Sequence, residues 1–297
     1  MEPELPPAWL VVREPKSKQP NLSAAFASKQ DAEAYLASGD AWPGSGIILD
    51  SPEAKLRLSA FPLAEPAHVT VRENWLKRHD KKLEPYLKVP KSCELLVYVN
   101  GTDYAPLASR KAGLCPLRKG EQWPACSECG KALGYAGVIR FAGSRESQWS
   151  HGDALVVFYC FECMPADGDA GIRLTWLKDG DALELAKGRG SGPARIASNW
   201  ELTEYVWDWE QDEKIGQLLH DQAAYAFFTF MWSTKIGGNL LWIQEDETPT
   251  CRCGKKMHYL GQISGHGDLE FGDCGVGYLF SCSKKKCLDT KMVVQCS

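Results

Sequence analysis

The feature that most constrains the fold of this 297-residue chain is a stretch of sequence that occurs twice. The first copy starts at Ser109 and the second at Ser233. Matching positions recur along both copies, namely Ser109 and Ser233, Lys111 and Lys235, Gly113 and Gly237, Pro124 and Pro249, Cys126 and Cys251, Cys129 and Cys253, Leu133 and Met257, Tyr135 and Tyr259, Gly137 and Gly261, and Ile139 and Ile263. So many matches at fixed offsets indicate an internal duplication. Its period of roughly 120 residues is too long for a solenoid, so it predicts two related half-domains.

Each copy contains four cysteines arranged as two pairs. In the first copy, Cys126 and Cys129 form one C-x-x-C pair, and Cys160 and Cys163 form another. Two turns that each present two thiolates are the arrangement that closes a tetrahedral zinc site. Gly130 follows the first pair and permits the left-handed turn that a metal knuckle often needs. The first copy therefore predicts one bound Zn²⁺ ion.

The second copy has a less regular set of four, which consists of Cys251, Cys253, Cys282 and Cys287. This set allows a second zinc ion, with Cys274 and His258 as competing ligands. Buried thiols or disulfides are the alternative interpretation of both sets. Paired spacing in a chain without secretion signals favours zinc over these alternatives.

Several longer motifs surround the second set. They are KIGG, P-x-C-x-CG-x-x-M-x-Y-L-G-Q-I, FGD-x-G-x-G-Y-L-F-x-C and a closing Q-C-S. With them, the C-terminal quarter of the chain resembles the YwqG-like family of uncharacterised bacterial proteins, and residues 90–180 resemble it loosely. In the first copy, Ala112-Gly113 replaces the doubled glycine. The resemblance implies a fold and a cytosolic bacterial setting rather than a reaction.

The doubled glycine and the C-x-C-G knuckle also give a more distant resemblance, to the eukaryotic programmed cell death protein 2 family. Members of that family look like zinc-containing chaperones for a ribosomal protein. For this chain, the resemblance implies a metal-stabilised protein that binds another protein.

Composition and charge exclude some classes of protein. Apolar residues make up 44% of the chain and charged residues 24%, which is ordinary for a soluble globular protein. The net charge of −4 argues against nucleic acid as a partner, because phosphate binding usually needs a basic field. The amino terminus does not have the pattern of a signal peptide. The longest nearly apolar run, Ala223–Trp232, is too short to cross a bilayer. We therefore expect a cytoplasmic protein without a membrane partner.

The patterns together predict an α+β, β-rich fold. Residues 1–88 are expected to form a mixed α/β segment, residues 89–186 the first zinc-knuckle half-domain, and residues 187–297 the second. Each half-domain is expected to contain an antiparallel sheet with a zinc-knuckle element, and the run KGRGSGP at 187–193 marks their junction. The expected strands include Tyr135–Phe141, Leu155–Phe161, Ile172–Leu177, Asn239–Ile243, Tyr259–Ile263, Gly277–Phe280 and Met292–Gln295.

An acidic, tryptophan-rich stretch opens the second half-domain at residues 199–213. It contains six carboxylates and no lysine or arginine, and three more carboxylates follow at 245–247. One interpretation is a solvated edge strand whose charges deter aggregation. The other is a docking surface for a basic protein, because aromatic side chains beside charges make good interface anchors. The candidate contact residues are Glu201, Glu204, Trp207, Asp208, Trp209, Glu210, Glu245, Asp246 and Glu247.

The motifs favour a binding protein over an enzyme. An H-G-D pattern occurs at 151–153 and at 266–268, within glycine turns where aspartate commonly bonds its own backbone. No G-x-S-x-G elbow, P-loop or H-E-x-x-H motif is present. Catalytic zinc needs an open coordination position, whereas four cysteines fill the shell. We therefore expect no catalysis, with a zinc-dependent hydrolase as the alternative.

The sequence thus predicts a non-catalytic, zinc-binding module that interacts with a basic protein. One hypothesis is an immunity protein that neutralises a cognate toxin, because opposite charge speeds capture. The other hypothesis is a holding chaperone for a ribosomal or other basic client, as the distant eukaryotic resemblance implies.

Overall fold

The computed structural model describes residues 9–13, 21–26, 29–30, 33, 46–49, 91–100, 104–165, 170–189, 192–204, 233–265, 271–272, 275–284 and 287–296. The chain divides into two compact units. One comprises Met1–Lys91 and Glu204–Phe230, and the other comprises Ser92–Thr203 and Met231–Ser297. Within the described ranges, no helix has the length and hydrophobicity that crossing a bilayer requires.

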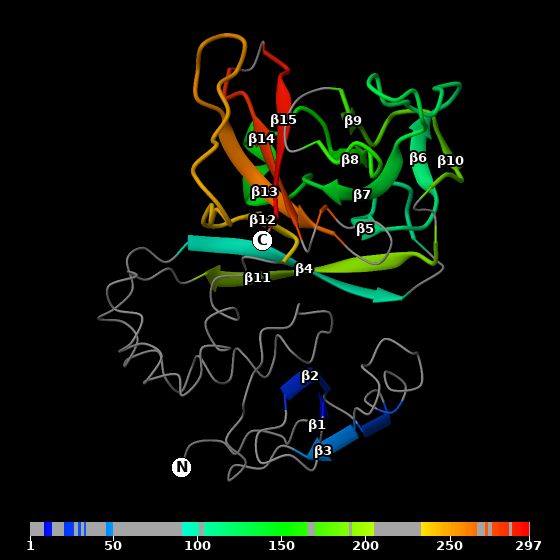
Figure 1. Ribbon diagram of the computed structural model, residues 1–297, viewed down its shortest axis with the longest axis vertical. Helices are drawn as coiled ribbons and strands as arrows, with labels where there is room; N and C mark the ends of the chain where they lie inside the picture. Colours follow the sequence, from blue (N-terminus) through cyan, green and yellow to red (C-terminus); the bar gives the residue numbers. More distant parts are fainter. Residues whose placement is uncertain are drawn as a thin grey trace. The chain divides into compact units, whose positions relative to one another are not determined.

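The first unit contains a three-stranded antiparallel sheet in the order β2-β1-β3, drawn in blue in Figure 1. Its strands are β1 (Trp9–Arg13), β2 (Asn21–Phe26) and β3 (Gly46–Leu49). Strand β1 lies in the centre and pairs with both neighbours.

The second unit is built on a ten-stranded sheet in the order β15-β14-β13-β12-β4-β11-β5-β7-β8-β9 (Figure 1). The strands are β4 (Lys91–Asn100), β5 (Arg110–Lys111), β7 (Gly134–Arg140), β8 (Ala154–Tyr159), β9 (Ile172–Leu177), β11 (Arg195–Glu204), β12 (Lys235–Gly237), β13 (His258–Ser264), β14 (Val276–Ser281) and β15 (Thr290–Gln295). A separate antiparallel pair joins β6 (Cys115–Arg118) to β10 (Leu183–Ala186). A 3₁₀ helix, η2 (Arg145–Trp149), precedes β8. The predicted β-rich character and antiparallel sheets are confirmed.

The ten strands fall into two sets of five, and within each set the last four strands are neighbours in chain order. We call β4, β5, β7, β8 and β9 the first strand set, and β11 to β15 the second. The initial strand of each set pairs with the other set, since β4 lies beside β12 and β11 beside β5. Corresponding hydrogen bonds fix both joins: the Leu96 N–H donates to the Thr234 carbonyl (3.0 Å) and the Ala197 N–H to the Ser109 carbonyl (2.8 Å). The two sets therefore exchange their first strands.

The contacts also correct the alignment of the two copies by one residue at their start. The Ser109 hydroxyl accepts from the Arg140 N–H at 2.8 Å, and the Thr234 hydroxyl accepts from the Ser264 N–H at 3.0 Å. Ser109 therefore corresponds to Thr234, and not to Ser233 as the sequence alignment predicts. With Ser109 matched to Thr234, the offset between the copies is 125 residues, the same as between Pro124 and Pro249, so the second copy gains no residue before its knuckle. The sequence alignment went wrong because it placed a gap there in order to match identical serine, lysine and glycine residues.

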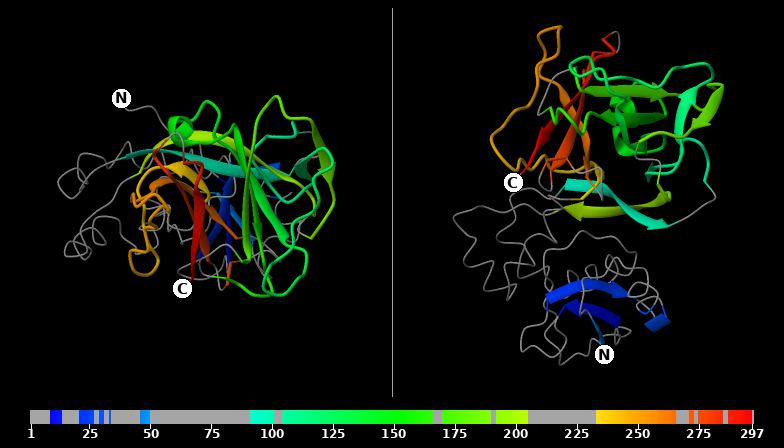
Figure 2. Two further views of the ribbon diagram at one scale, coloured as in Figure 1. Left: turned by 90° about the horizontal axis from the view of Figure 1, so that it is seen from above. Right: turned by 45° about the vertical axis from the view of Figure 1, so that its right-hand side comes forward.

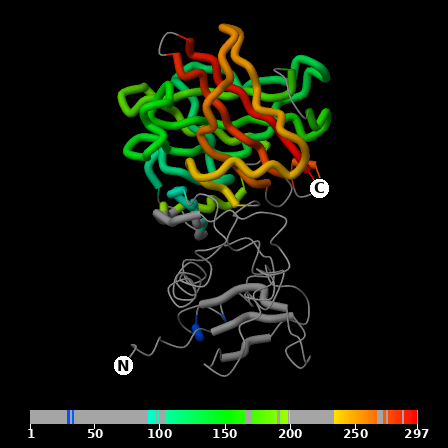
Figure 3. Tube along the Cα trace, turned by 90° about the vertical axis from the view of Figure 1, so that its left-hand side faces the viewer, coloured from blue at the N-terminus to red at the C-terminus, as the bar shows by residue number. Residues whose placement is uncertain are grey.

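The core lies between the two strand sets, which pack against each other around it (Figures 2 and 3). Side chains of a strand alternate between the two faces of its sheet. Leu155, Val157 and Tyr159 of β8 accordingly join the shared inner core, whereas the side chains between them lie in an outer cluster with Cys126 and Cys160. Both faces of β8 are buried, as the unbroken apolar run Leu155–Phe161 predicts.

One predicted strand is wrong. Asn239–Ile243 forms a loop that covers the outer face of the second strand set, and it does not join the sheet. Trp242 stacks on Phe280 with ring centroids 5.8 Å apart, and the Leu241 carbonyl accepts from the Tyr278 hydroxyl at 2.7 Å. The apolar residues of this segment cover an outer hydrophobic cluster. A segment with this role and a strand paired in a sheet can have the same apolar pattern, so the sequence does not distinguish them.

Candidate metal centres

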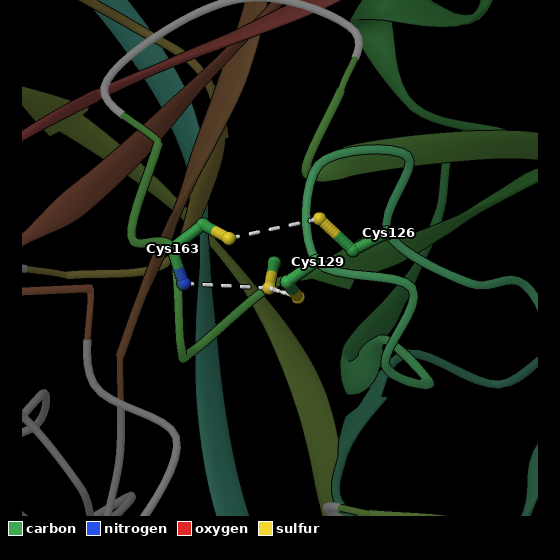
Figure 4. A group of neighbouring side chains, drawn as sticks. Cys126, Cys129 and Cys163 are labelled. Carbon is green, nitrogen blue, oxygen red and sulfur yellow. Dashed lines mark hydrogen bonds between the residues drawn. The ribbon is translucent and has the colours of Figure 1, made fainter.

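The four cysteines of the first copy come together in space. Their sulfur atoms all lie within 4.8 Å of one another. Cys126 Sγ lies 3.8 Å from Cys163 Sγ, and Cys129 Sγ lies 3.7 Å from Cys160 Sγ (Figure 4). Cys126 and Cys160 are buried, while Cys129 and Cys163 are exposed. The group therefore sits at the surface with two of its ligands anchored in the outer core.

Local backbone bonds position these sulfurs. The Cys126 N–H donates to the Lys131 carbonyl at 2.8 Å, and the Gly130 N–H donates to the Cys126 carbonyl at 2.9 Å. Gly130 has φ of +70°, the left-handed conformation that closes the turn with least strain. Cys160 directly follows β8, and its sulfur accepts from the Cys163 N–H at 3.4 Å. A turn and a strand end thus present two sulfurs each.

The second set repeats this geometry. Its sulfurs also lie within 4.8 Å of one another, with 3.2 Å between Cys251 and Cys287 and 3.6 Å between Cys253 and Cys282. The Cys251 N–H donates to the Lys255 carbonyl at 2.8 Å, which matches the Cys126 bond in the first knuckle. The structure thus places all eight predicted ligands in two groups of four.

These distances fit a metal better than disulfides. A disulfide holds its sulfurs about 2.05 Å apart, and all eight cysteines are free thiols. A regular tetrahedron with Zn–S bonds of about 2.3 Å places the sulfurs about 3.8 Å apart. The four sulfur–sulfur separations given above, from 3.2 to 3.8 Å, lie at or slightly below that value. The donor set is suitable for zinc or another thiophilic metal.

Charged groups surround the first centre. Burial alone would raise the pKa of the Cys160 thiol, but backbone hydrogen bonds from Cys163 and Glu162 lower it to about 7. Glu162 lies between these two cysteines and forms ion pairs with Lys131 (3.2 Å) and Arg189 (2.8 Å). Zinc with four thiolates carries a charge of about −2, so nearby cations favour the loaded state.

The second centre has a similar environment. Backbone hydrogen bonding at Lys255 is the main cause that lowers the pKa of Cys253 to about 7. The Arg252 side chain bonds to Cys287, which raises the pKa of that guanidinium. Lys284 is exposed in the loop between the last two ligands. A cation therefore lies beside each proposed metal.

His258, the competing ligand that the structure describes, is not part of either group. His258 Nε2 lies 2.7 Å from the Glu146 carboxylate and stacks against Trp149, so it joins η2 to β13. Cys274 lies outside the described residues. Of the two H-G-D patterns, only 151–153 is described, and there the Asp153 carboxylate accepts from the Asp179 N–H at 2.9 Å. The bond joins Asp153 to the backbone of another turn, 26 residues later in the chain, and not to its own backbone as the turn interpretation expects.

The predicted partner surface is described only in part. Glu201 and Glu204 belong to β11, while Trp207, Asp208, Trp209 and Glu210 lie outside the described residues. The side chains of residues 245–247 are exposed, and two of them bond within the chain. Asp246 accepts from Thr248 and pairs with Lys256 (3.5 Å), and Glu247 accepts from Gln295 (2.7 Å).

The sequence pattern missed two cavities beside the centres, of about 610 Å³ and 420 Å³. Both lie at the last strands of the two strand sets, and both include a proline that precedes a knuckle, Pro249 in one and Pro124 in the other. The repeated proline was the only signal for them in the sequence. The strand residues that line the two cavities have the same sequence pattern as the residues of other strands.

Compared with models of known protein families and with curated proteins, the chain matches none of them.

Proposed function

We propose that the chain is a zinc-stabilised, non-catalytic protein-binding module made of two related zinc-knuckle half-domains. The observation that carries this proposal is the pair of closed four-sulfur groups. In each group four cysteines supply the whole tetrahedral shell, so a bound zinc ion has no open position for water or substrate. Such a metal stabilises a fold and does not activate a nucleophile.

The related knuckles are supported by their matching contacts. Each knuckle has an isolated bridge around its first cysteine, at Ala125 and Ala132 in one and at Thr250 and Lys256 in the other. A backbone bond from the residue after the knuckle to the preceding proline also recurs, at 2.9 Å in the first and 3.0 Å in the second. These correspondences support descent from one duplicated unit, as the matching positions of the two copies predict.

A basic protein is the partner that the sequence favours. The carboxylates of residues 201–210 concentrate negative charge beyond the mild average of the chain. Opposite charges speed encounter, and aromatic anchors slow release. We place the binding of a basic toxin, in the manner of an immunity protein, ahead of holding a ribosomal client. Recovery of a toxin or of a ribosomal protein with the affinity-tagged chain distinguishes the two.

The metal content of the purified protein tests the proposal. We expect two zinc ions per chain, and Cys160→Ser and Cys282→Ser should each lower this number by one. Structural zinc contributes on the order of 10 kcal/mol of apparent binding energy in small domains, so chelation should unfold the second unit. Ser127→Ala, a change within the first knuckle that removes no ligand, is the control that keeps both metals. A protein that stays fully folded without metal contradicts the proposal.

A further inference from the structure

The two end strands of the ten-stranded sheet face each other without pairing. Strands β9 and β15 lie near each other (Figure 1). The Trp176 indole N–H donates to the Thr290 hydroxyl at 2.8 Å and so joins the two strands. In the described residues, β9 forms a ladder only with β8, and β15 forms one only with β14. We call the join between β9 and β15 the seam.

The backbone of β9 has hydrogen-bonding groups directed into the seam. The Gly171 carbonyl accepts from the Cys160 N–H at 2.7 Å, and the Leu177 carbonyl accepts from the Asp153 N–H at 2.8 Å, so odd-numbered residues bond toward β8. In an antiparallel ladder the residues between them direct their N–H and C=O groups to the opposite side. These are the backbone groups of the even-numbered residues of β9, which include Ile172 and Leu174.

Strand β15 is arranged in the same way. The Asp289 carbonyl accepts from the Cys282 N–H at 3.0 Å, so the odd-numbered residues of this strand bond to β14. The backbone groups of Thr290 and Met292 therefore also point into the seam. Unpaired strand edges are templates for an additional strand.

The seam opens into a groove made of both cavities. The larger cavity, of about 610 Å³, is lined by the seam-facing residues Ile172, Leu174, Thr290 and Met292. The smaller one, of about 420 Å³, lies over β9 beside the first knuckle. The two share Ile172 and Arg173 as lining residues, so they adjoin along β9. We call them together the seam groove.

The charges of the seam groove favour an acidic ligand. Arg173 and Lys291 hold corresponding places, opposite Phe158 in β8 and Phe280 in β14. The Arg173 guanidinium is exposed and forms no ion pair or hydrogen bond with another described residue. Lys291 is half-exposed, and its ammonium group donates to the Thr250 carbonyl at 3.3 Å, which is its one hydrogen bond to a described residue.

The acidic residues of the groove already bond within the chain. Glu121 accepts from the Arg118 N–H at 3.2 Å, and Glu247 accepts from the Gln295 amide at 2.7 Å. Arg118 also pairs with the Glu121 carboxylate (3.8 Å), whereas the Gln295 amide is neutral and leaves the charge of Glu247 in place. The two lining cations, Arg173 and Lys291, have no anionic partner among the described residues.

We propose that the seam groove binds an extended, acidic segment of another protein, which pairs as a strand with the free edge of β9. Backbone hydrogen bonds to Ile172 and Leu174 hold the segment, and its carboxylates meet Arg173 and Lys291. Main-chain bonds supply the affinity in this mode of recognition, and alternate side chains supply the specificity. Strand β9 is the edge used because it lines both cavities.

This inference goes beyond the proposed function, because it concerns a groove that shares only Glu247 with the predicted acidic surface and a ligand of the opposite charge. It requires neither the acidic stretch at 201–210 nor a basic partner. A protein without bound zinc would therefore not contradict peptide binding at the seam groove. Failure to bind the peptide would likewise leave the expected zinc content unchanged.

Binding of a model peptide to the zinc-loaded full chain tests the proposal. The probe is a fluorescein-labelled peptide of eight residues in which valine and glutamate alternate, with a valine–lysine peptide as its matched control. We expect saturable fluorescence anisotropy with the glutamate peptide only. Hydrogen exchange should slow at the amides of Ile172 and Leu174 when that peptide is present, and not at those of β4.

Charge reversal locates the site. Arg173→Glu and Lys291→Glu should each weaken binding by about fivefold, the factor expected for one exposed ion pair. Lys178→Glu reverses an exposed cation just beyond β9 that lines neither cavity, so it should leave the affinity unchanged. Circular dichroism and zinc content verify that each variant is folded. Equal binding of both peptides, insensitivity to the two reversals, or unchanged exchange at β9 overturns the proposal.

Discussion

Two buried cations hold corresponding places in the two strand sets. Arg110 and Lys235 are both fully buried, and each donates to the carbonyl four residues later, Leu114 (2.7 Å) and Asn239 (2.8 Å). Arg110 also donates to two carbonyls upstream and lies 4.5 Å from the centre of the Tyr104 ring. Each cation therefore fastens the loop that follows its short strand.

The three carbonyl contacts of Arg110 make its planar side chain difficult to replace. We expect Arg110→Lys to lower the free energy of unfolding by about 1–3 kcal/mol, because one ammonium group leaves buried carbonyls unpaired. Urea denaturation measures the change. Arg173→Lys, at an exposed site, should stay within about 0.5 kcal/mol. Equal stability of the two variants would show that the Arg110 contacts contribute little.

A third buried cation gives the protein a dependence on pH. Lys111 donates to the Ser264 hydroxyl at 2.6 Å. Burial, with a smaller contribution from Arg195, lowers its pKa to about 7. Between about pH 7 and the usual lysine pKa, the folded state binds fewer protons than the unfolded state, so stability increases with pH in that range.

The variant Lys111→Met isolates this effect. Relative to it, the free energy of unfolding of the wild type should rise between pH 7 and 8.5, with a slope of at most about 1.4 kcal/mol per pH unit. Below pH 6 the difference should become constant. Parallel stability profiles for the two proteins over pH 6–8.5 would refute the assignment.

At the scale of elements, the two strand sets carry the same bulge. Register shifts occur between Tyr135 and Gly137 in β7 and between Tyr259 and Gly261 in β13. Both glycines have large positive φ, 158° and 151°. A Cβ atom on Gly261 would lie 2.3 Å from the Lys235 carbonyl oxygen. The bulge thus brings the short strand β12 against β13 too closely for any side chain.

Gly261→Ala should therefore lower the free energy of unfolding by about 2–4 kcal/mol, since the clash is with backbone and cannot be relieved by a rotamer change. Thermal unfolding of the zinc-loaded protein measures it. Gly180→Ala is the matched control, because no atom lies within 4 Å of its added Cβ. A Gly261→Ala variant as stable as the control would mean that β12 can shift away from the added methyl group without a cost in stability.

At the scale of the whole molecule, the exchanged strands join the two strand sets into one sheet. Strand β4 pairs with β12 over Cys93–Leu95, and β11 pairs with β5 at Arg195 and Ile196. Further links run through η2, where the Trp149 carbonyl accepts from the Ser281 hydroxyl at 2.7 Å. Loss of either set removes pairing partners from the other.

The second unit should therefore unfold in a single step. Cys160→Ser changes a residue that directly follows β8 of the first strand set, yet it should speed hydrogen exchange in β13 and β14 about as much as in β7 and β8. Fragments 89–186 and 187–297 should each fail to fold alone and should associate when co-expressed. Cooperative folding of an isolated fragment would contradict this coupling.

Part of this organisation could be predicted from the sequence. The partners within each cysteine pair lie two to five residues apart, so spacing alone indicates a shared ligand. Most of the strands of the ten-stranded sheet follow from apolar runs and alternation, which are local properties of the chain. The corresponding prolines and bulge glycines also mark their places without knowledge of the fold.

The sequence by itself determined which residues are grouped as ligands and which segments form most of the strands, because both depend on neighbours along the chain. Only the tertiary structure decided that β4 and β11 change places and that β9 and β15 meet at an unpaired seam. Strands far apart in the chain pair through backbone N–H and C=O groups, which are the same for every residue type except proline. The sequence therefore does not indicate which strand edges will pair. The groove at the seam follows from that choice, and no side-chain pattern specifies it.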